Sequence, residues 1–131
     1  MSPPEPRPVT VIFDTSAIFT RQSIHVGELL AEVDEEGGAA GLPVTCLVEA
    51  VHAVHDTGRL DVLVNHRATV LLADKPADGL VLATAYDVVG RQDAASAILG
   101  AIDHDCAVLT RRPGLYAGLD GTGGRILTID G

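Results

Sequence analysis

Three acidic residues of this sequence stand where a carboxylate can take part in chemistry, and Asp14 is the first. It directly follows Val9–Phe13, a β-branched and aromatic run that predicts a strand buried on both faces. Functional groups of open parallel sheets gather beyond the carboxyl ends of the strands, so we expect Asp14 there. The alternative is that Asp14 caps a helix, although Thr15 or Ser16 can also cap and would leave Asp14 free.

The second acid is Asp93, which begins a helical segment over Ala94–Ile102. The amides and the dipole of a helix N-terminus favour a carboxylate, so a purely structural cap is the alternative to a functional role. Thr110, Arg111 and Arg112 leave a further strand, Cys106–Leu109, at the same sheet edge. A hydroxyl and two guanidinium groups are therefore expected beside the acids.

The third acid, Glu49, belongs to an amphipathic helix. It lies about 200° around that helix from Leu47 and so faces away from the apolar stripe, or else is a solvated surface charge. His52 and His55 continue the pattern E-x-x-H-x-x-H, but all three cannot converge on one ion, and we interpret the histidines as surface residues. The apolar stripe consists of Leu47, Ala50, Val51 and Val54.

Apolar strands alternate with helices along the whole chain. This alternation predicts an α/β fold in three layers, with a parallel sheet covered by helices on both faces. Residues 1–131 form one domain without internal repeats, and the Pro-rich segment 1–8 is expected to be flexible. The predicted strands are Val9–Phe13, Pro43–Cys46, Thr69–Ala73, Cys106–Leu109 and Ile126–Ile129. The predicted helices are Val26–Val33, the segment that carries the apolar stripe from Leu47 to Val54, Leu80–Val89 and Ala94–Ile102. Leu80–Val89 is apolar almost all round, so we expect this helix to be buried. A Gly-rich loop spans Gly118–Gly124.

The charge balance limits the range of partners. Nine Lys and Arg against 18 Asp and Glu give a net charge of −9, which argues against broad electrostatic binding to nucleic acid. It leaves room for a small cationic rim, for a metal ion, or for a basic partner. No apolar run approaches the roughly 18–20 residues of a bilayer span, and the N-terminus lacks a signal-peptide pattern. We therefore expect a cytoplasmic protein that does not enter the membrane.

The ordered set of motifs resembles the PIN-domain family, including VapC-type toxin ribonucleases of toxin–antitoxin pairs. The resemblance spans Val9 to Ile129. It rests on Val11-Ile-Phe-Asp-Thr-Ser-Ala-Ile18, Val44-Thr-Cys-Leu-Val-Glu-Ala50, Asp93-Ala-Ala-Ser-Ala97 and Cys106-Ala-Val-Leu-Thr110.

This resemblance implies a sheet of about five parallel strands and an Mg²⁺- or Mn²⁺-dependent endoribonuclease, often a homodimer, with a basic antitoxin as partner. It also implies roles for single residues. Asp14 and Asp93 would bind the metal directly, and Glu49 would join them in catalysis. Thr15, Ser16 and Thr110 would orient the acids or waters. Hard oxygen ligands of this kind suit Mg²⁺ or Mn²⁺ rather than Zn²⁺.

The sequence departs from the family pattern at Arg112, where a fourth acid is usual. An inward Arg112 would neutralise the site, whereas an outward Arg112, together with Arg111, would hold a substrate phosphate. The alternative to an active ribonuclease is a degenerate PIN module that binds other proteins. A haloacid-dehalogenase phosphatase needs an acid where Ser16 stands, and a response-regulator receiver needs a late lysine, whereas Lys75 is the sole lysine.

Overall fold

The computed structural model describes residues 7–19, 24–53, 58–119 and 125–128, and its centre is a five-stranded parallel sheet. The strand order is β3-β2-β1-β4-β5, with β1 in the middle as predicted. The register pairs Phe13 of β1 with Leu109 of β4, so the two strands end side by side. The strands are β1 Val9–Phe13, β2 Ala39–Pro43, β3 Thr69–Leu72, β4 Ala107–Thr110 and β5 Arg125–Thr128.

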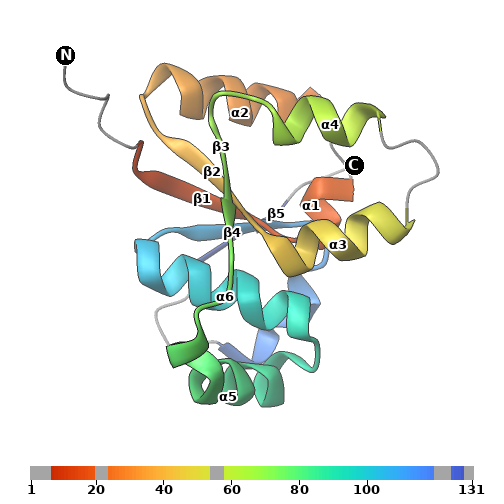
Figure 1. Cartoon of the computed structure of the whole chain (residues 1–131), viewed down its shortest axis with the longest axis vertical. Helices are drawn as coiled ribbons and strands as arrows, with labels where there is room; N and C mark the ends of the chain where they lie inside the picture. The colour runs from red at the N-terminus through yellow and green to blue at the C-terminus, as the bar shows by residue number, and fades with distance from the viewer. Residues whose placement is uncertain (1–6, 20–23, 54–57, 120–124, 129–131) are drawn as a thin grey trace.

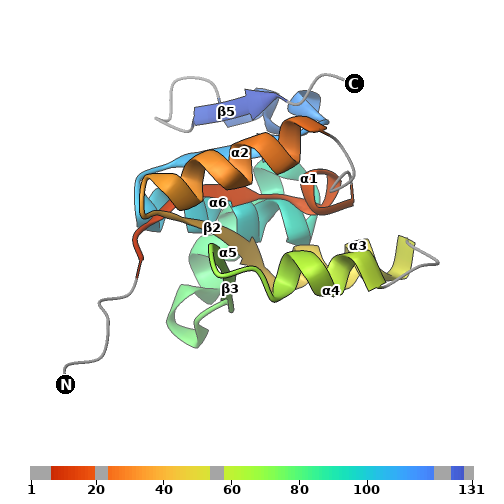
Figure 2. The same ribbon diagram turned by 90° about the horizontal axis from the view of Figure 1, so that it is seen from above.

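Helices cover both faces of this sheet (Figure 1). The long helix α6 packs against β1, β2 and β4 on one face, and α2 and α4 lie over the opposite face, as Figure 2 shows from above. The predicted three-layer α/β/α architecture is thereby confirmed. The α-helices are α1 Thr15–Phe19, α2 Ile24–Glu35, α3 Val44–Ala53, α4 Gly58–Val64, α5 Gly79–Val89 and α6 Gln92–His104. Two short 3-10 helices are labelled η1 (Pro76–Asp78) and η2 (Pro113–Leu119).

Small residues let α6 approach the sheet closely. The buried side of α6 is rich in alanine and includes Gly100. A Cβ atom added to Gly41 of β2 would lie 2.7 Å from Leu72 Cδ1 and 2.9 Å from Ile12 Cδ1, and one added to Gly100 would lie 3.3 Å from Ile12 Cδ1. The side chains of Ile12 and Leu72 thus fill the space that the two glycines leave, and this packing holds the middle of α6 close to β1 and β2.

Two local predictions are wrong. Val44–Cys46 begins α3 rather than forming a strand, because the second strand is completed earlier, at Pro43. The apolar segment Leu80–Val89 is helical but not buried, since α5 packs on the outer side of α6 and buries only Val89. Leu80 is 86% exposed.

The apolar side of α3 is also rotated from its predicted position. Cys46 and Ala50 are buried, whereas Val51 is 40% exposed. Val54 and His55, Ile129, and residues 120–124 of the predicted Gly-rich loop lie outside the described residues.

The described part of the chain begins at Arg7, so residues 1–6 of the predicted flexible segment 1–8 lie outside it. The Arg7 guanidinium is 2.6 Å from Asp34 at the end of α2, and Arg67 pairs with the same carboxylate at 2.7 Å. These two hydrogen-bonded arginines lower the pKa of Asp34 to about 2. Within the described ranges, no helix is long and apolar enough to cross a membrane.

Candidate active site

Asp14 leaves β1 at its carboxyl end and is almost fully buried, with 3% of its surface exposed. Its Oδ1 atom accepts hydrogen bonds from the Ser16 hydroxyl at 2.7 Å and from the Ala17 amide at 3.0 Å. The bond from Ala17 satisfies an amide of the first turn of α1, so Asp14 does cap this helix. Its Oδ2 atom accepts a 2.7 Å hydrogen bond from the Tyr116 hydroxyl of η2.

Asp93 is the second residue of α6 and is 6% exposed. The Arg91 guanidinium donates two hydrogen bonds to the Asp93 carboxylate. They run from Nε to Oδ1 at 3.0 Å and from Nη2 to Oδ2 at 3.1 Å. Thr15 Oγ1 donates to Oδ2 at 2.6 Å, and the Ala94 amide donates to Oδ1 at 2.9 Å. Burial raises the pKa of Asp93, but the bonds from Arg91 and Thr15 outweigh it and hold the pKa below its usual value.

Three hydroxyl groups lie close to the two acids. Thr15 and Ser16 stand next to Asp14 in sequence, and they bind Asp93 and Asp14 respectively. The hydroxyl groups of Ser16 and Thr110 share a hydrogen bond of 3.2 Å, which ties the end of β4 to α1. Of the three residues that were expected to orient the acids, Thr15 and Ser16 bind them directly, and Thr110 binds Ser16.

One cavity of about 210 Å³ opens onto both acids. Arg91 and Arg112 line it together with Asp14 and Asp93, and its remaining wall is mostly apolar. That wall includes Phe19, Ala53, Leu115 and Tyr116. Phe19 is 45% exposed, so part of this side chain is accessible to solvent at the cavity.

The other predicted site residues lie farther out. Glu49 is exposed on α3 and does not belong to the described lining of the cavity, although its charge contributes to raising the pKa of Arg91 after the larger effect of Asp93. Arg111 is exposed, and its backbone amide binds Ser16 Oγ at 2.9 Å. Arg112 is also exposed, and within the described residues its guanidinium forms no ion pair with either acid.

Sequence reasoning missed Arg91 and Tyr116, the two residues whose side chains bind the acids from outside the motifs. Arg91 stands two positions before Asp93, and an arginine directly before a helix that opens with an acid is a usable signal. Tyr116 follows the Thr110 motif in a short 3-10 helix, and nothing in the sequence marks it as a partner of Asp14.

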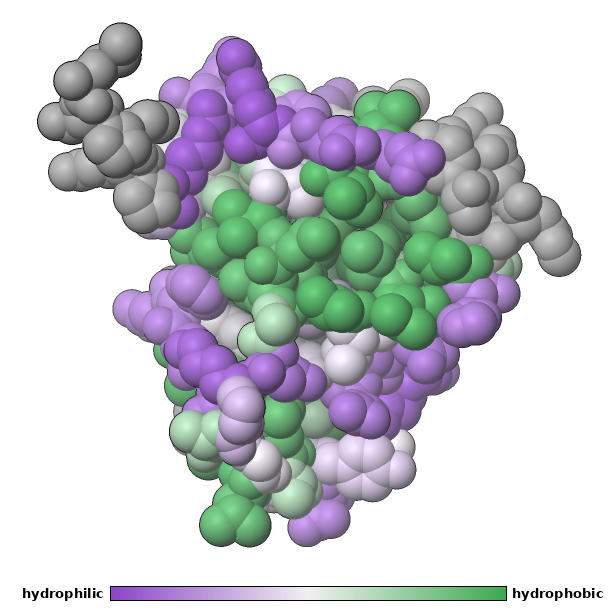
Figure 3. All heavy atoms as spheres, in the orientation of Figure 1, coloured by the Kyte–Doolittle hydropathy of each residue, from purple (hydrophilic) through white to green (hydrophobic). Residues whose placement is uncertain are grey.

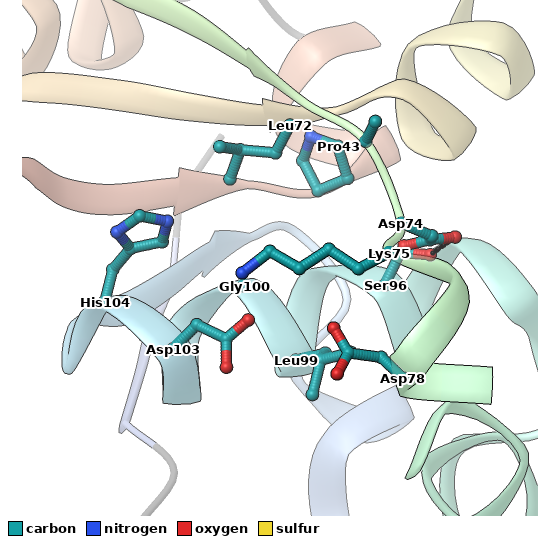
Figure 4. A pocket seen from close by; sticks show the side chains of 11 residues that line it. Pro43, Leu72, Asp74, Lys75, Asp78, Ser96, Leu99, Gly100, Asp103 and His104 are labelled. Carbon is teal, nitrogen blue, oxygen red and sulfur yellow. Dashed lines mark hydrogen bonds between the residues drawn. The ribbon is translucent and has the colours of Figure 1, made fainter. Parts of the chain in front are cut away.

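A second, smaller hollow of about 60 Å³ lies beside the end of β3. Figure 4 shows the Lys75 side chain lying along it, past Gly100 and towards Asp103 and His104. The Ser96 hydroxyl donates a 3.0 Å bond to Asp74 at its rim. Neither Asp14 nor Asp93 lines this hollow, so it is separate from the candidate site.

Solved structures share this architecture. The crystal structure of VapBC2 from Rickettsia felis, bound to a DNA fragment from its promoter, matches 93% of this chain and 100% of that one with a TM-score of 0.70 at 10% identity. The chain has a PIN-like fold. The structure of PAE2754 from Pyrobaculum aerophilum matches 91% of this chain and 84% of that one, with a TM-score of 0.61 at 17% identity. No family model and no curated protein sequence matches the chain.

A PIN-like fold raises the question of whether these residues fit a divalent cation. A carboxylate offers about four lone-pair sites. The four hydrogen bonds from Arg91, Thr15 and Ala94 fill those of Asp93, and three bonds leave one site on Asp14. Among the described residues, no three His, Cys, Asp or Glu side chains lie close enough together to hold an ion. The acids therefore do not fit a metal ion while Arg91 remains bound to Asp93.

Proposed function

We propose that this chain is a PIN-like endoribonuclease that acts in the cytoplasm as the toxin of a toxin–antitoxin pair. The observation that supports it best is the pairing of two buried aspartates, Asp14 and Asp93, in one cavity at the carboxyl end of the sheet. Burial disfavours the charged form of a carboxylate, so two buried acids that line one cavity mark it as a candidate functional site. The sequence motifs and the fold likeness to the VapBC2 complex agree with this proposal.

Different side chains at the cavity would contact different parts of a bound RNA strand. Arg112, exposed and without an acidic partner in the described part of the chain, is suited to hold a phosphate at the cavity mouth. Phe19, which is partly exposed at the cavity, would place an aromatic side chain close to a base of the bound strand. Thr15, Ser16 and Thr110 would keep the two carboxylates in fixed positions while the strand binds.

The test is cleavage of labelled single-stranded RNA by the purified chain in the presence of Mn²⁺ or Mg²⁺. We expect Asp14→Asn and Asp93→Asn each to reduce cleavage by about 100-fold or more. Asp103→Asn is the matched control, because Asp103 is an exposed aspartate of α6 outside the cavity, and it should retain full cleavage. Equal cleavage by wild type and Asp14→Asn would identify a contaminating nuclease, and a folded wild type that cleaves no RNA would reject the enzyme.

A protein-binding module without catalysis is the second candidate. The filled lone pairs of Asp93 favour it, and so does an uncovered apolar surface. Figure 3 shows apolar side chains gathered across the face on which β3 lies. On α3, α4 and β3 the exposed apolar residues are Val44, Val48, Val51, Val62 and Leu71, which we call the apolar band.

A second copy of this chain is the occupant that we propose for the apolar band. The edge strand β3 carries no charged residue to prevent pairing with a second β3. We expect light scattering to report a dimer for wild type and a monomer for Val48→Asp, with Glu49→Gln on the same helix unchanged. A monomeric wild type would reject this use of the band and leave it to a different protein, such as an antitoxin.

A further inference from the structure

The Arg91–Asp93 pair has the geometry of a strong, specific ion pair. Both bonds run between the planar fork of the guanidinium and the two oxygens of one carboxylate, at 3.0 and 3.1 Å. Bidentate pairs of this kind are stronger than single bonds between neutral groups. The partners differ in exposure, since 40% of the Arg91 side chain is accessible and only 7% of that of Asp93. Arg91 can therefore leave without unpacking the core, whereas Asp93 cannot.

Neither helix capping nor the helix dipole explains why an arginine stands at position 91. It occupies the N-cap position of α6 with an extended backbone (φ −145°, ψ 140°) and makes no side-chain cap bond there. A cation at a helix N-terminus has the unfavourable sign for the helix dipole. The favourable partner is the carboxylate of Asp93, whose pKa the guanidinium helps to lower while its own pKa is raised.

We propose that Arg91 is an internal counter-ion that occupies the place of a divalent cation on Asp93, so that metal and Arg91 bind in competition. Arg91 supplies two of the four hydrogen bonds that fill the lone pairs of Asp93. Its withdrawal would free one lone pair on each oxygen and remove a positive charge from the cavity. The consequence of this competition for RNA cleavage rests on the proposed function, but the competition itself is a property of the binding site.

Arg112 provides a matched control. It lines the same cavity and carries the same charge, but within the described residues it forms no ion pair with Asp93. A general effect of lowering the positive charge at the cavity would appear equally in Arg91→Gln and Arg112→Gln. Competition for the oxygens of Asp93 would appear in Arg91→Gln alone.

Titration calorimetry with Mn²⁺ tests the proposal. We expect Arg91→Gln to bind Mn²⁺ at least about tenfold more tightly than wild type, since a charge in contact with the ion is removed, and Arg112→Gln to change affinity much less. The double variant Arg91→Gln, Asp93→Asn should not show this increase in Mn²⁺ affinity. Arg91→Met, with an unbranched apolar side chain, serves if Arg91→Gln does not fold. Mn²⁺ affinity that is unchanged in the folded Arg91 variant, or raised equally by Arg112→Gln, overturns the proposal.

RNA cleavage measured on the same proteins separates this inference from the proposed function. A rise in Mn²⁺ affinity without cleavage by any variant would leave the counter-ion role standing and reject the ribonuclease. Cleavage by wild type, with no gain in affinity in Arg91→Gln, would reject the counter-ion role and leave the ribonuclease standing.

Discussion

The hydrogen bond from Tyr116 to Asp14 allows a sharp test of how the site contributes to stability. Tyr116 is 2% exposed, and its hydroxyl lies 2.7 Å from Asp14 Oδ2. Burial and the neighbouring Asp14 raise the pKa of Tyr116, so the phenol remains a proton donor at any physiological pH. Tyr116→Phe removes this donor and keeps the ring.

The expected loss follows from the kind of bond that is removed. A hydrogen bond to a charged group contributes about 1.5–3 kcal/mol to the free energy of unfolding. For a domain of this size, that corresponds to a fall of roughly 5–12 °C in melting temperature. The ring itself stays buried, so little apolar burial is lost.

Urea unfolding of four proteins measures the effect. They are wild type, Tyr116→Phe, Asp14→Ala and the double variant, and the coupling between the two changes isolates the hydrogen bond. Tyr86→Phe is the control, because Tyr86 is 48% exposed and its change should alter stability by less than about 0.5 kcal/mol. A loss of the same size for Tyr116→Phe with and without Asp14 would refute the reasoning, as would a loss no larger than that of Tyr86→Phe.

Two further predictions concern packing and charge. Gly41→Ala should lower the free energy of unfolding by about 1–3 kcal/mol, since the new methyl group would lie 2.7 Å from Leu72 Cδ1, and a urea midpoint equal to wild type would contradict this. Arg67 and Arg7 lower the pKa of Asp34 from its ordinary value of 3.8 to about 2 in the folded state. The ionised carboxylate therefore stabilises the folded state fully above pH 3.8, and this contribution is lost as the pH falls towards 2. Arg67→Gln should therefore have a lower urea midpoint than wild type at pH 6 and a smaller deficit at pH 3, whereas an equal deficit at both pH values would assign the effect to packing.

The fold was predictable because its strands are short, apolar and placed between helices. Val9–Phe13 has the same bounds in sequence and structure, and Asp14 stands at the predicted edge. The residues around Val44 were harder, because β2 (Ala39–Pro43) consists of small residues and proline, which carry little strand signal, while the β-branched Val44 and Thr45 begin a helix. Local propensity was overridden there by the packing of β2 between β1 and β3.

The exposure of α5 was not predictable from its composition. A helix that is apolar all round is expected in a core, but α5 lies outside α6, with Leu80 and Val81 open to solvent. The side-chain contacts of the candidate site were also predictable only in part. The motifs placed Asp14, Asp93 and three hydroxyl residues together. Tyr116 depends on the direction of a 3-10 helix, which no spacing rule describes, whereas Arg91 was missed although its place two positions before Asp93 was a usable signal.

The capping bond from Ala17 to Asp14 has a consequence for how this protein changes over evolutionary time. The same carboxylate holds the first turn of α1 and receives Tyr116, so its loss would damage folding whether or not the protein cleaves anything. Selection for a folded chain alone is then enough to retain Asp14 in descendants that have lost all activity. An aspartate at this position in a related sequence therefore reports that α1 is intact, whereas a change at Arg112, whose guanidinium forms no ion pair with either acid within the described residues, carries no such cost to the fold.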